Sequence, residues 1–436
     1  MAERSIGGAS RYRGSAMPFA DRVQHGARLT PFDPRIPIDL GSREFSDHQY
    51  DWYRFLLEHA PACRGKLSVL RVNLVARYDD CRTVLTDPRF LRNRGRAAGK
   101  GASPLPFPLP KSIAALARSM IIEDDPEHRR LRNLVSKAFT PRAIGRLSHR
   151  VEELSHELLD GLEKRGASFD LLEDYARPIP ERVIAEMMGL PDGDTDRFHA
   201  SMHVLSKGLS GWSIARTLLW DLRAARRTVN ELIERKRAEP GDDILSQLIH
   251  AEEAGDRLTH DETLSLVFLL IIAGFETTLH LITNGVRTLL EHPAELARLH
   301  AEPELWDSGV EEIVRHRGPI HATKPVYPSE DVTFHGVTFE RGTPTLPLLA
   351  AANHDPAVFE EPDRFDVARS PNRHLGFGFG AHFCLGAQLA RMETRVALRN
   401  LFERAPELRL AVKPEELRIQ RLPGWHRHES LPVVLG

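Results

Sequence analysis

The chain has 436 residues, and 41% of them are hydrophobic, so it can bury a large core and is not a disordered polypeptide. Its formal net charge of −2 excludes a global field that would attract nucleic acid or an anionic membrane. The three cysteines, Cys63, Cys81 and Cys384, are far apart and odd in number, which excludes a disulfide scaffold and a four-cysteine zinc site and favours a reducing cytoplasm.

Residues 1–44 are rich in Gly, Arg, Ser and Pro and lack periodicity, so we expect a flexible N-terminal arm, with translation starting at Met1 or at Met17. No apolar leader follows the basic residues at the start. The longest apolar stretch, Leu264–Phe275, is too short to cross a bilayer, which takes about 20 residues. We therefore expect a soluble cytoplasmic protein whose residues 45–436 form one domain.

Alternating apolar and polar residues predict a half-buried strand or hairpin over Leu67–Ala76, and a helix is expected over about 78–86. Within 91–118, four prolines alternate with apolar residues, which excludes a helix and predicts an extended loop. From 141 to 290, apolar residues recur at helical spacing, so helices should dominate this part of the chain.

The pattern Thr259-His-Asp-Glu262 has the form of a capping box and opens a helix that should end near Glu291, before Pro293. Its middle is apolar nearly all round, so this helix should cross the centre of the molecule. A small hairpin is expected over 331–349, and a helix from about 385 to 403. The predicted fold class is mainly α, a single large helical domain with small β-sheets and a long central helix.

Cys384 carries the strongest chemical signal. It lies in the segment Phe377-Gly-Phe-Gly-Ala-His-Phe-Cys384-Leu-Gly386, directly before a predicted helix. Glycines allow a backbone to come close to a flat ligand, and the N-terminus of a helix stabilises a thiolate. A thiolate is a strong axial ligand of haem iron. A buried structural cysteine in a turn is the alternative interpretation.

A second motif, Ala273-Gly-Phe-Glu276-Thr277-Thr278, lies in the apolar central helix. Burying its carboxylate costs several kcal/mol unless the group is paired or hydrogen-bonded. Gly274 would leave room for a ligand, and a hydroxyl that bonds back to a carbonyl would open the helix. The alternative is a polar notch in a packed helix.

Both motifs resemble those of the cytochrome P-450 family. The segment around Cys384 matches every fixed position of the family's haem-binding loop, F-x-x-G-x-x-x-C-x-G, and the second motif resembles its oxygen-activation motif, (A/G)-G-x-(D/E)-T-(T/S). The resemblance spans about residues 45–436. It implies haem b as the cofactor, Cys384 as the ligand of its iron, Thr277 as the group that hydrogen-bonds dioxygen, and Glu276 as a proton relay. Further haem contacts implied in the two motifs are Ala273, Gly274, Phe377, Gly378 and Gly386.

Glu312 and Arg315 have the i,i+3 spacing of a helical ion pair, for which a surface position is the default interpretation. With Arg364 of the segment Pro362-Asp-Arg364-Phe365, they resemble the family's buried Glu-Arg-Arg triad. That resemblance implies a structural lock beneath the haem.

Cations that could bind the two haem propionates form the last group of candidates. His128 and Arg132 lie at i,i+4 on one predicted helix face, which suits carboxylates, although a solvated basic helix start is the alternative. They resemble the family's H-x-x-x-R contact, and His382 and His374 are implied as further contacts. At the position where bacterial members usually carry an arginine, this chain has Val326, so Lys324 is expected to substitute as a point charge.

The resemblance implies a monooxygenase of secondary metabolism that uses O2 to hydroxylate or epoxidise a small apolar molecule. Electrons would come from a separate ferredoxin and an NAD(P)H-dependent ferredoxin reductase. Three basic residues on the helix after Cys384 are expected to dock an acidic partner, with a solvated face as the alternative: Arg391, Arg395 and Arg399. The implied lining of the substrate pocket comprises 91–118, 195–222, Leu270–Thr277 and 319–326.

The sequence leaves three alternatives to the monooxygenase. A haem-thiolate peroxygenase or isomerase is one alternative, and the intact Glu276-Thr277 pair argues against it. A non-catalytic haem-binding sensor is another, and no attached signalling segment supports it. A hydrolase with a cysteine nucleophile would need a matching histidine and no haem.

Overall fold

The computed structural model describes residues 37–67, 69–99, 119–165, 168–190, 222–253 and 255–435. Most of the predicted N-terminal arm, most of the predicted loop 91–118 and nearly all of the predicted pocket segment 195–222 lie outside these ranges. Within the predicted arm, Ile38 and Asp39 form strand β1 (Ile38–Asp39), which pairs with β2 (Ala62–Leu67).

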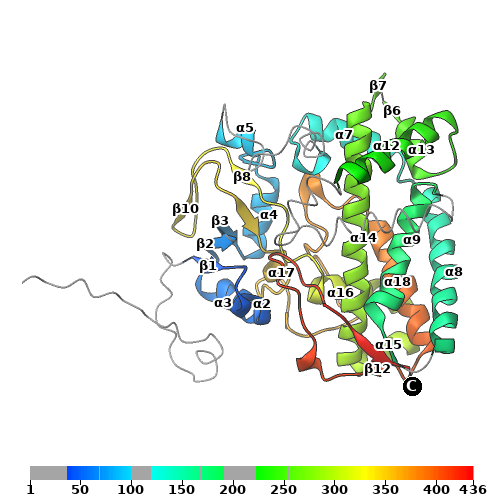
Figure 1. The fold of residues 1–436 in the computed structure, drawn as a ribbon. Helices are drawn as coiled ribbons and strands as arrows, with labels where there is room; N and C mark the ends of the chain where they lie inside the picture. The colour runs from blue at the N-terminus through cyan, green and yellow to red at the C-terminus, as the bar shows by residue number, and fades with distance from the viewer. Residues whose placement is uncertain are drawn as a thin grey trace, which may run out of the picture.

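Helices predominate, which confirms the predicted fold class, and the longest is α14 (His260–Glu291), which runs through the middle of the molecule (Figure 1). The predicted capping box is present at its start: Thr259 accepts from the backbone N–H of Glu262, whose side chain accepts in turn from the N–H of Thr259. The helix is long and apolar enough to cross a membrane, but most of that stretch is buried. It packs against α9, α12, α16 and α18, as the core helix of a globular domain does.

The remaining helices cluster around α14 or cover the small sheets. The helix predicted over about 78–86 is α4, and the helix predicted after Cys384 is α18. The other described helices are α2 (Arg43–Asp47), α3 (Gln49–His59), α5 (Arg94–Ala98), α7 (Glu127–Ser136), α8 (Pro141–Arg165), α9 (Pro178–Met187), α12 (Leu222–Ala238), α13 (Ile244–Ile249), α15 (Pro293–Ala301), α16 (Trp306–Arg317) and α17 (Leu349–Ala352), with short η1 (Met120–Ile122), η2 (Leu172–Ala176), η4 (Pro303–Leu305), η5 (Gly380–His382) and η6 (Pro414–Glu416). The two helices that the sequence predicted have the observed bounds α4 (Tyr78–Thr86) and α18 (Ala387–Arg404).

The sheets are small, as predicted. The four-stranded sheet has the order β1-β2-β3-β11, in which β2 and β3 form an antiparallel hairpin and β11 runs parallel to β3. The predicted hairpin around His335-Gly336 is present, and both residues have positive φ, as a tight two-residue turn requires. The strands not yet bounded are β3 (Leu70–Val75), β4 (Phe90–Leu91), β5 (Ser168–Asp170), β6 (Glu252–Glu253), β7 (Asp256–Arg257), β8 (Tyr327–Pro328), β9 (Val332–Phe334), β10 (Val337–Phe339), β11 (Thr345–Pro347), β12 (Arg409–Leu410) and β13 (Pro432–Val434).

The main hydrophobic core lies around α14 and includes the apolar faces of α8, α9, α16 and α18. Two smaller cores lie under the hairpin β2–β3 and under the hairpin β9–β10. Helix α18 packs directly against α14, so the helix that follows the Cys384 loop and the helix that carries Glu276 and Thr277 share one core. The two sequence motifs are thereby fixed on neighbouring elements of the core.

Candidate active site

The loop before α18 holds Cys384 by backbone contacts. The Cys384 N–H donates to the carbonyl of Phe377 at 2.9 Å, which closes the loop. Gly378 and Gly380 both have φ of +74°, in the left-handed region that favours glycine. A Cβ atom on Gly380 would also lie 3.0 Å from the carbonyl oxygen of Leu85 in α4. The glycines therefore allow the tight turn and its close approach to α4.

The Cys384 thiol is exposed, whereas the other two cysteines are buried. Desolvation by the surrounding protein raises the pKa of the Cys384 thiol, which outweighs the lowering by the backbone N–H of Gly386 and by the positive charges of Arg132 and Arg391. The backbone N–H of Gly386, directly before α18, thus favours the thiolate, whereas burial favours the thiol. Since a metal binds the thiolate form, metal binding here would release the thiol proton.

The middle of α14 presents an accessible face. Ile272 is 49% exposed and Ala273 is exposed, although most of the helix around them is buried. The Thr277 hydroxyl donates to the carbonyl of Ala273 at 2.5 Å, the back-bond that the sequence motif suggests. A Cβ atom on Gly274 would lie 3.3 Å from Cδ1 of Ile184 in α9, so this glycine allows α9 to pack closely. Close packing against α9 is therefore one structural reason for a glycine at this position.

Glu276 forms an ion pair with an arginine from the end of the chain. Nη2 of Arg427 lies 2.5 Å from Oε2 of Glu276, and the two side chains are only 8% and 15% exposed. The guanidinium group of Arg427 lies 3.5 Å from the ring centroid of Trp425, which holds it in place by a cation–π contact. The carboxylate in the apolar helix thus has the partner that its burial requires.

Positively charged and imidazole groups converge beside Cys384. The rings of His128 and His382 are 4.0 Å apart, and Nε2 of His128 is buried with no hydrogen-bond partner among the described residues. Burial, Arg92 and the neighbouring His128 and Arg132 lower the pKa of His382 to about 3. Arg92 is buried and donates to the backbone carbonyl of Lys324. In the described part of the chain neither Arg132 nor Lys324 forms an ion pair, so this cluster can bind acidic groups of a ligand.

His374 does not join this cluster. Its Nε2 lies 2.9 Å from Oε2 of Glu311, and its Nδ1 accepts the N–H of Gly376 at 3.2 Å. Arg391 binds the same carboxylate. Both ring nitrogens of His374 are thus used within the protein, tying the loop to α16, which contradicts the predicted propionate contact.

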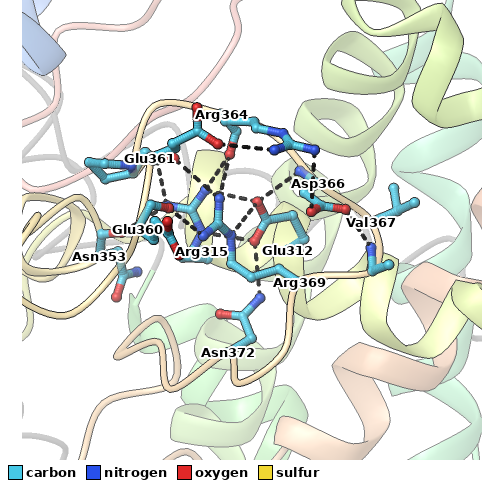
Figure 2. Close-up of polar contacts among 12 residues, drawn as sticks. Glu312, Arg315, Asn353, Glu360, Glu361, Arg364, Asp366, Val367, Arg369 and Asn372 are labelled. Atoms are coloured by element: carbon cyan, nitrogen blue, oxygen red, sulfur yellow. Dashed lines mark hydrogen bonds and ion pairs between the residues drawn. The ribbon is translucent and has the colours of Figure 1, made fainter.

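The predicted ion pair of α16 is buried and forms the centre of a network (Figure 2). Nε and Nη2 of Arg315 each donate to Glu312 at 2.8 Å, and both side chains are fully buried. The prediction of Arg364 as the third member is wrong, because its side chain is 57% exposed and pairs with Glu361. Arg369 takes that place: its Nε lies 3.1 Å from Oε1 of Glu312, and its side chain is 11% exposed. Figure 2 shows the guanidinium group of Arg364 on the outer side of the network.

Arg92, Arg369 and Arg427 were missed by sequence reasoning. Each lies far along the chain from the group it serves, so no local spacing marks it. The signal that could have helped is chemical: a buried carboxylate such as Glu276 or Glu312 needs a cation. That requirement says that a partner exists, but not which of many arginines supplies it.

Comparison with known proteins identifies the family. Residues 82–405 match the family model described as Cytochrome P-450. The chain is 37% identical to the cytochrome P-450 monooxygenase PikC of Streptomyces venezuelae, over 94% of this chain and 96% of that protein. It is 40% identical to the mycinamicin IV hydroxylase/epoxidase of Micromonospora griseorubida, over 83% and 89% of the two chains. The solved structure of the bacillaene polyketide synthase cytochrome P-450 PksS of Bacillus subtilis 168 superposes with a TM-score of 0.84 at 35% identity, covering 91% of this chain and 99% of that one.

The family's cofactor, haem, fits the residues described above. Cys384 offers an accessible sulfur, and Gly378 and Gly380 give the adjoining loop its tight turn. The orphaned Nε2 of His128, with His382, Arg92 and Arg132, provides donors for the two propionates. Sequence family, fold and site agree: this chain belongs to the cytochrome P-450 family and is a haem-dependent monooxygenase.

Proposed function

We propose that this chain carries haem b and inserts one oxygen atom of O2 into a small apolar molecule, by hydroxylation or epoxidation. Residues 45–436 form the catalytic domain, and the enzyme works in the cytoplasm with a ferredoxin and an NAD(P)H-dependent ferredoxin reductase. The observation that carries the proposal is the accessible Cys384 thiol beside Arg132, His128 and His382, in the loop before α18, which packs against the helix that carries Glu276 and Thr277. Names of similar proteins, which refer to a polyketide synthase and to mycinamicin, support a polyketide-derived substrate.

Haem ligated by a thiolate supplies the cleavage of the O–O bond and the transfer of oxygen to carbon. The protein supplies the rest. Cys384 holds the iron, the cations around His128 and His382 orient the propionates, and the accessible face of α14 at Ala273 borders the reacting groups. The Thr277 hydroxyl offers a proton at Oγ1, and Glu276 supplies protons to it from solvent.

The decisive experiment uses isotopically labelled O2. Purified enzyme, reconstituted with ferredoxin, reductase and NAD(P)H, is screened against apolar compounds for a substrate-induced shift of the haem absorption. Compounds that bind are expected to acquire one labelled oxygen atom, detected by mass spectrometry. Turnover with peroxide alone, with no labelled product from O2, would contradict the proposal.

Thr277→Ala is expected to uncouple the reaction. Consumption of NAD(P)H continues, but product formation falls by roughly 10- to 100-fold and peroxide accumulates, because the hydroxyl that donates the proton is lost. The matched control is Thr283→Ala, since Thr283 makes the same back-bond to the carbonyl of Leu279 at 2.9 Å elsewhere on α14. Equal coupling in the two variants would remove Thr277 from the relay.

The basic stripe predicted to dock a ferredoxin is already paired within the protein. Arg391 binds Glu311, Arg395 binds Asp307 and Arg399 binds Glu403. A different basic surface lies beside the haem loop. Arg77, Arg82 and Arg373 are exposed and form no ion pair with described residues. Arg82 and Arg373 line a surface hollow together with Phe379 and Phe383 of the loop.

We therefore expect the double variant Arg82→Glu/Arg373→Glu to be reduced by ferredoxin about tenfold more slowly at low salt, because the surface charge that attracts an acidic partner is reversed. The dependence of the rate on ionic strength should flatten as well. Stopped-flow reduction measures both quantities. Arg399→Glu, a charge reversal on the neighbouring helix face, serves as the control, and an equal loss there would argue against a docking surface at Arg82.

A further inference from the structure

A polar stripe runs along α14 from Glu276 to the end of the helix. Glu276, His280, Asn284, Arg287 and Glu291 are three or four residues apart and so share one helix face. All charged, imidazole and amide side chains of α14 after Glu276 lie on this face. His280 and Asn284 are buried, whereas the side chains of Arg287 and Glu291 are 16% and 21% exposed. Two buried side chains therefore connect Glu276, whose side chain is 15% exposed, with a partly exposed pair at the end of the helix.

The C-terminal segment 425–428 lies along this stripe, and Figure 1 shows the red C-terminal part of the chain passing across α14. Nδ2 of Asn284 donates to the carbonyl of His426 at 3.2 Å, and Arg427 binds Glu276. The backbone N–H of His426 donates to the carbonyl of Pro319 at 2.9 Å, which fixes the segment. Arg427 and His428 are thereby held against the inner half of the stripe.

The inner half of the stripe and segment 425–428 together form a polar strip. Buried polar atoms without partners gather in this strip. Among the described side chains, thirteen buried nitrogen or oxygen atoms have no hydrogen-bond partner in the protein. Six of them belong to the strip: Nδ1 of His280, Oδ1 of Asn284, Nε2 of His426, Nε of Arg427 and both ring nitrogens of His428. Buried polar groups in native proteins that lack a protein partner are paired with ordered water. The strip is therefore a place for bound water.

The imidazoles of the strip are suited to pass protons on. Burial, with the charges of Arg427 and Arg177, lowers the pKa of His280 to about 3. Burial also lowers the pKa of His428 far below its ordinary value, and Arg287 and Arg317 add to this. A neutral imidazole donates at one nitrogen and accepts at the other. Such a ring, hydrogen-bonded to water on both sides, transfers a proton without retaining its charge.

We propose that this strip is a water-filled proton path that leads from Glu291 and Arg287 at the end of α14, through His428 and His280, to Glu276. The inference rests on the proposed role of Glu276 as the proton relay. Arg427 acts as a positioning residue, because its contacts with Trp425 and Glu276 fix the carboxylate at the inner end of the path. Protons consumed by the monooxygenase reaction enter along α14.

His428→Leu tests the path most directly. His428 is fully buried and its ring makes no hydrogen bond with the described residues, so leucine removes the relay without breaking a hydrogen bond of the described part of the chain. We expect product formation to fall about tenfold, the H2O/D2O isotope effect on turnover to rise, and the fraction of NAD(P)H used for product to fall. The matched control is His316→Leu, a half-buried histidine with a buried, orphaned ring nitrogen, which lies on α16 against Phe365.

A second readout does not depend on turnover. In a high-resolution crystal structure of the haem-loaded enzyme, ordered waters are expected within hydrogen-bond distance of the rings of His280 and His428. The absence of ordered water from the strip would overturn the path but not the proposed role of Glu276. The same conclusion would follow if His428→Leu behaved like His316→Leu while Glu276→Gln uncoupled the reaction. If Glu276→Gln itself leaves coupling and isotope effect unchanged, the proposed relay fails first.

Discussion

Cys384→Ser is expected to reduce product formation to background. The serine hydroxyl does not provide the anionic sulfur that donates to iron, and no other sulfur lies in the loop. The primary measurement is spectroscopic: the reduced enzyme treated with carbon monoxide should lose the red-shifted absorption that thiolate ligation gives. Haem content should fall as well, since the propionate contacts alone must then retain the cofactor.

Cys63→Ser is the matched control for this prediction. Cys63 is buried in the hairpin β2–β3, away from the haem loop, and burial raises the pKa of its thiol to about 12. Its substitution is expected to leave the absorption of the carbon monoxide complex unchanged. A Cys384→Ser protein that keeps the red-shifted absorption would refute the assignment of Cys384 as the iron ligand.

Glu312→Gln is expected to lower the free energy of unfolding by about 3–5 kcal/mol, since removing one partner of a buried ion pair leaves an uncompensated charge. Arg315 is 1% exposed and has no access to water that could replace the carboxylate. Glu312 also accepts from the backbone N–H of Asp366 and from Nδ2 of Asn372, each at 3.0 Å. Urea unfolding of the apoprotein and the haem content of the purified enzyme measure the effect.

Arg369→Met and Arg364→Met separate the observed network from the predicted one. Arg369 binds Glu312 and donates to the carbonyls of Glu360 and Arg364, so its loss should cost about 3 kcal/mol. The exposed pair of Arg364 with Glu361 contributes at most about 1 kcal/mol. A larger loss for Arg364→Met than for Arg369→Met would restore the triad that the sequence suggested.

Local rules determined which elements form. The capping box of α14, the turn at His335-Gly336 and the helix over Tyr78–Thr86 were predicted close to their observed bounds, because caps, positive-φ turns and apolar periodicity act within a few residues. Cys384 and the pair Glu276–Thr277 were predicted as site residues in the same way, since each lies in a short contiguous motif.

Only the tertiary structure decided how charges pair across the chain. Arg369, and not Arg364, pairs with Glu312 in the triad. Arg427 of the C-terminal segment pairs with Glu276. Glu311 binds both His374 and Arg391. The chain has 59 lysines and arginines and 61 acidic residues, so local spacing leaves many pairings open. Which of them forms depends on burial, because a desolvated carboxylate requires a cation while an exposed one is satisfied by water, and burial is set by how the helices pack.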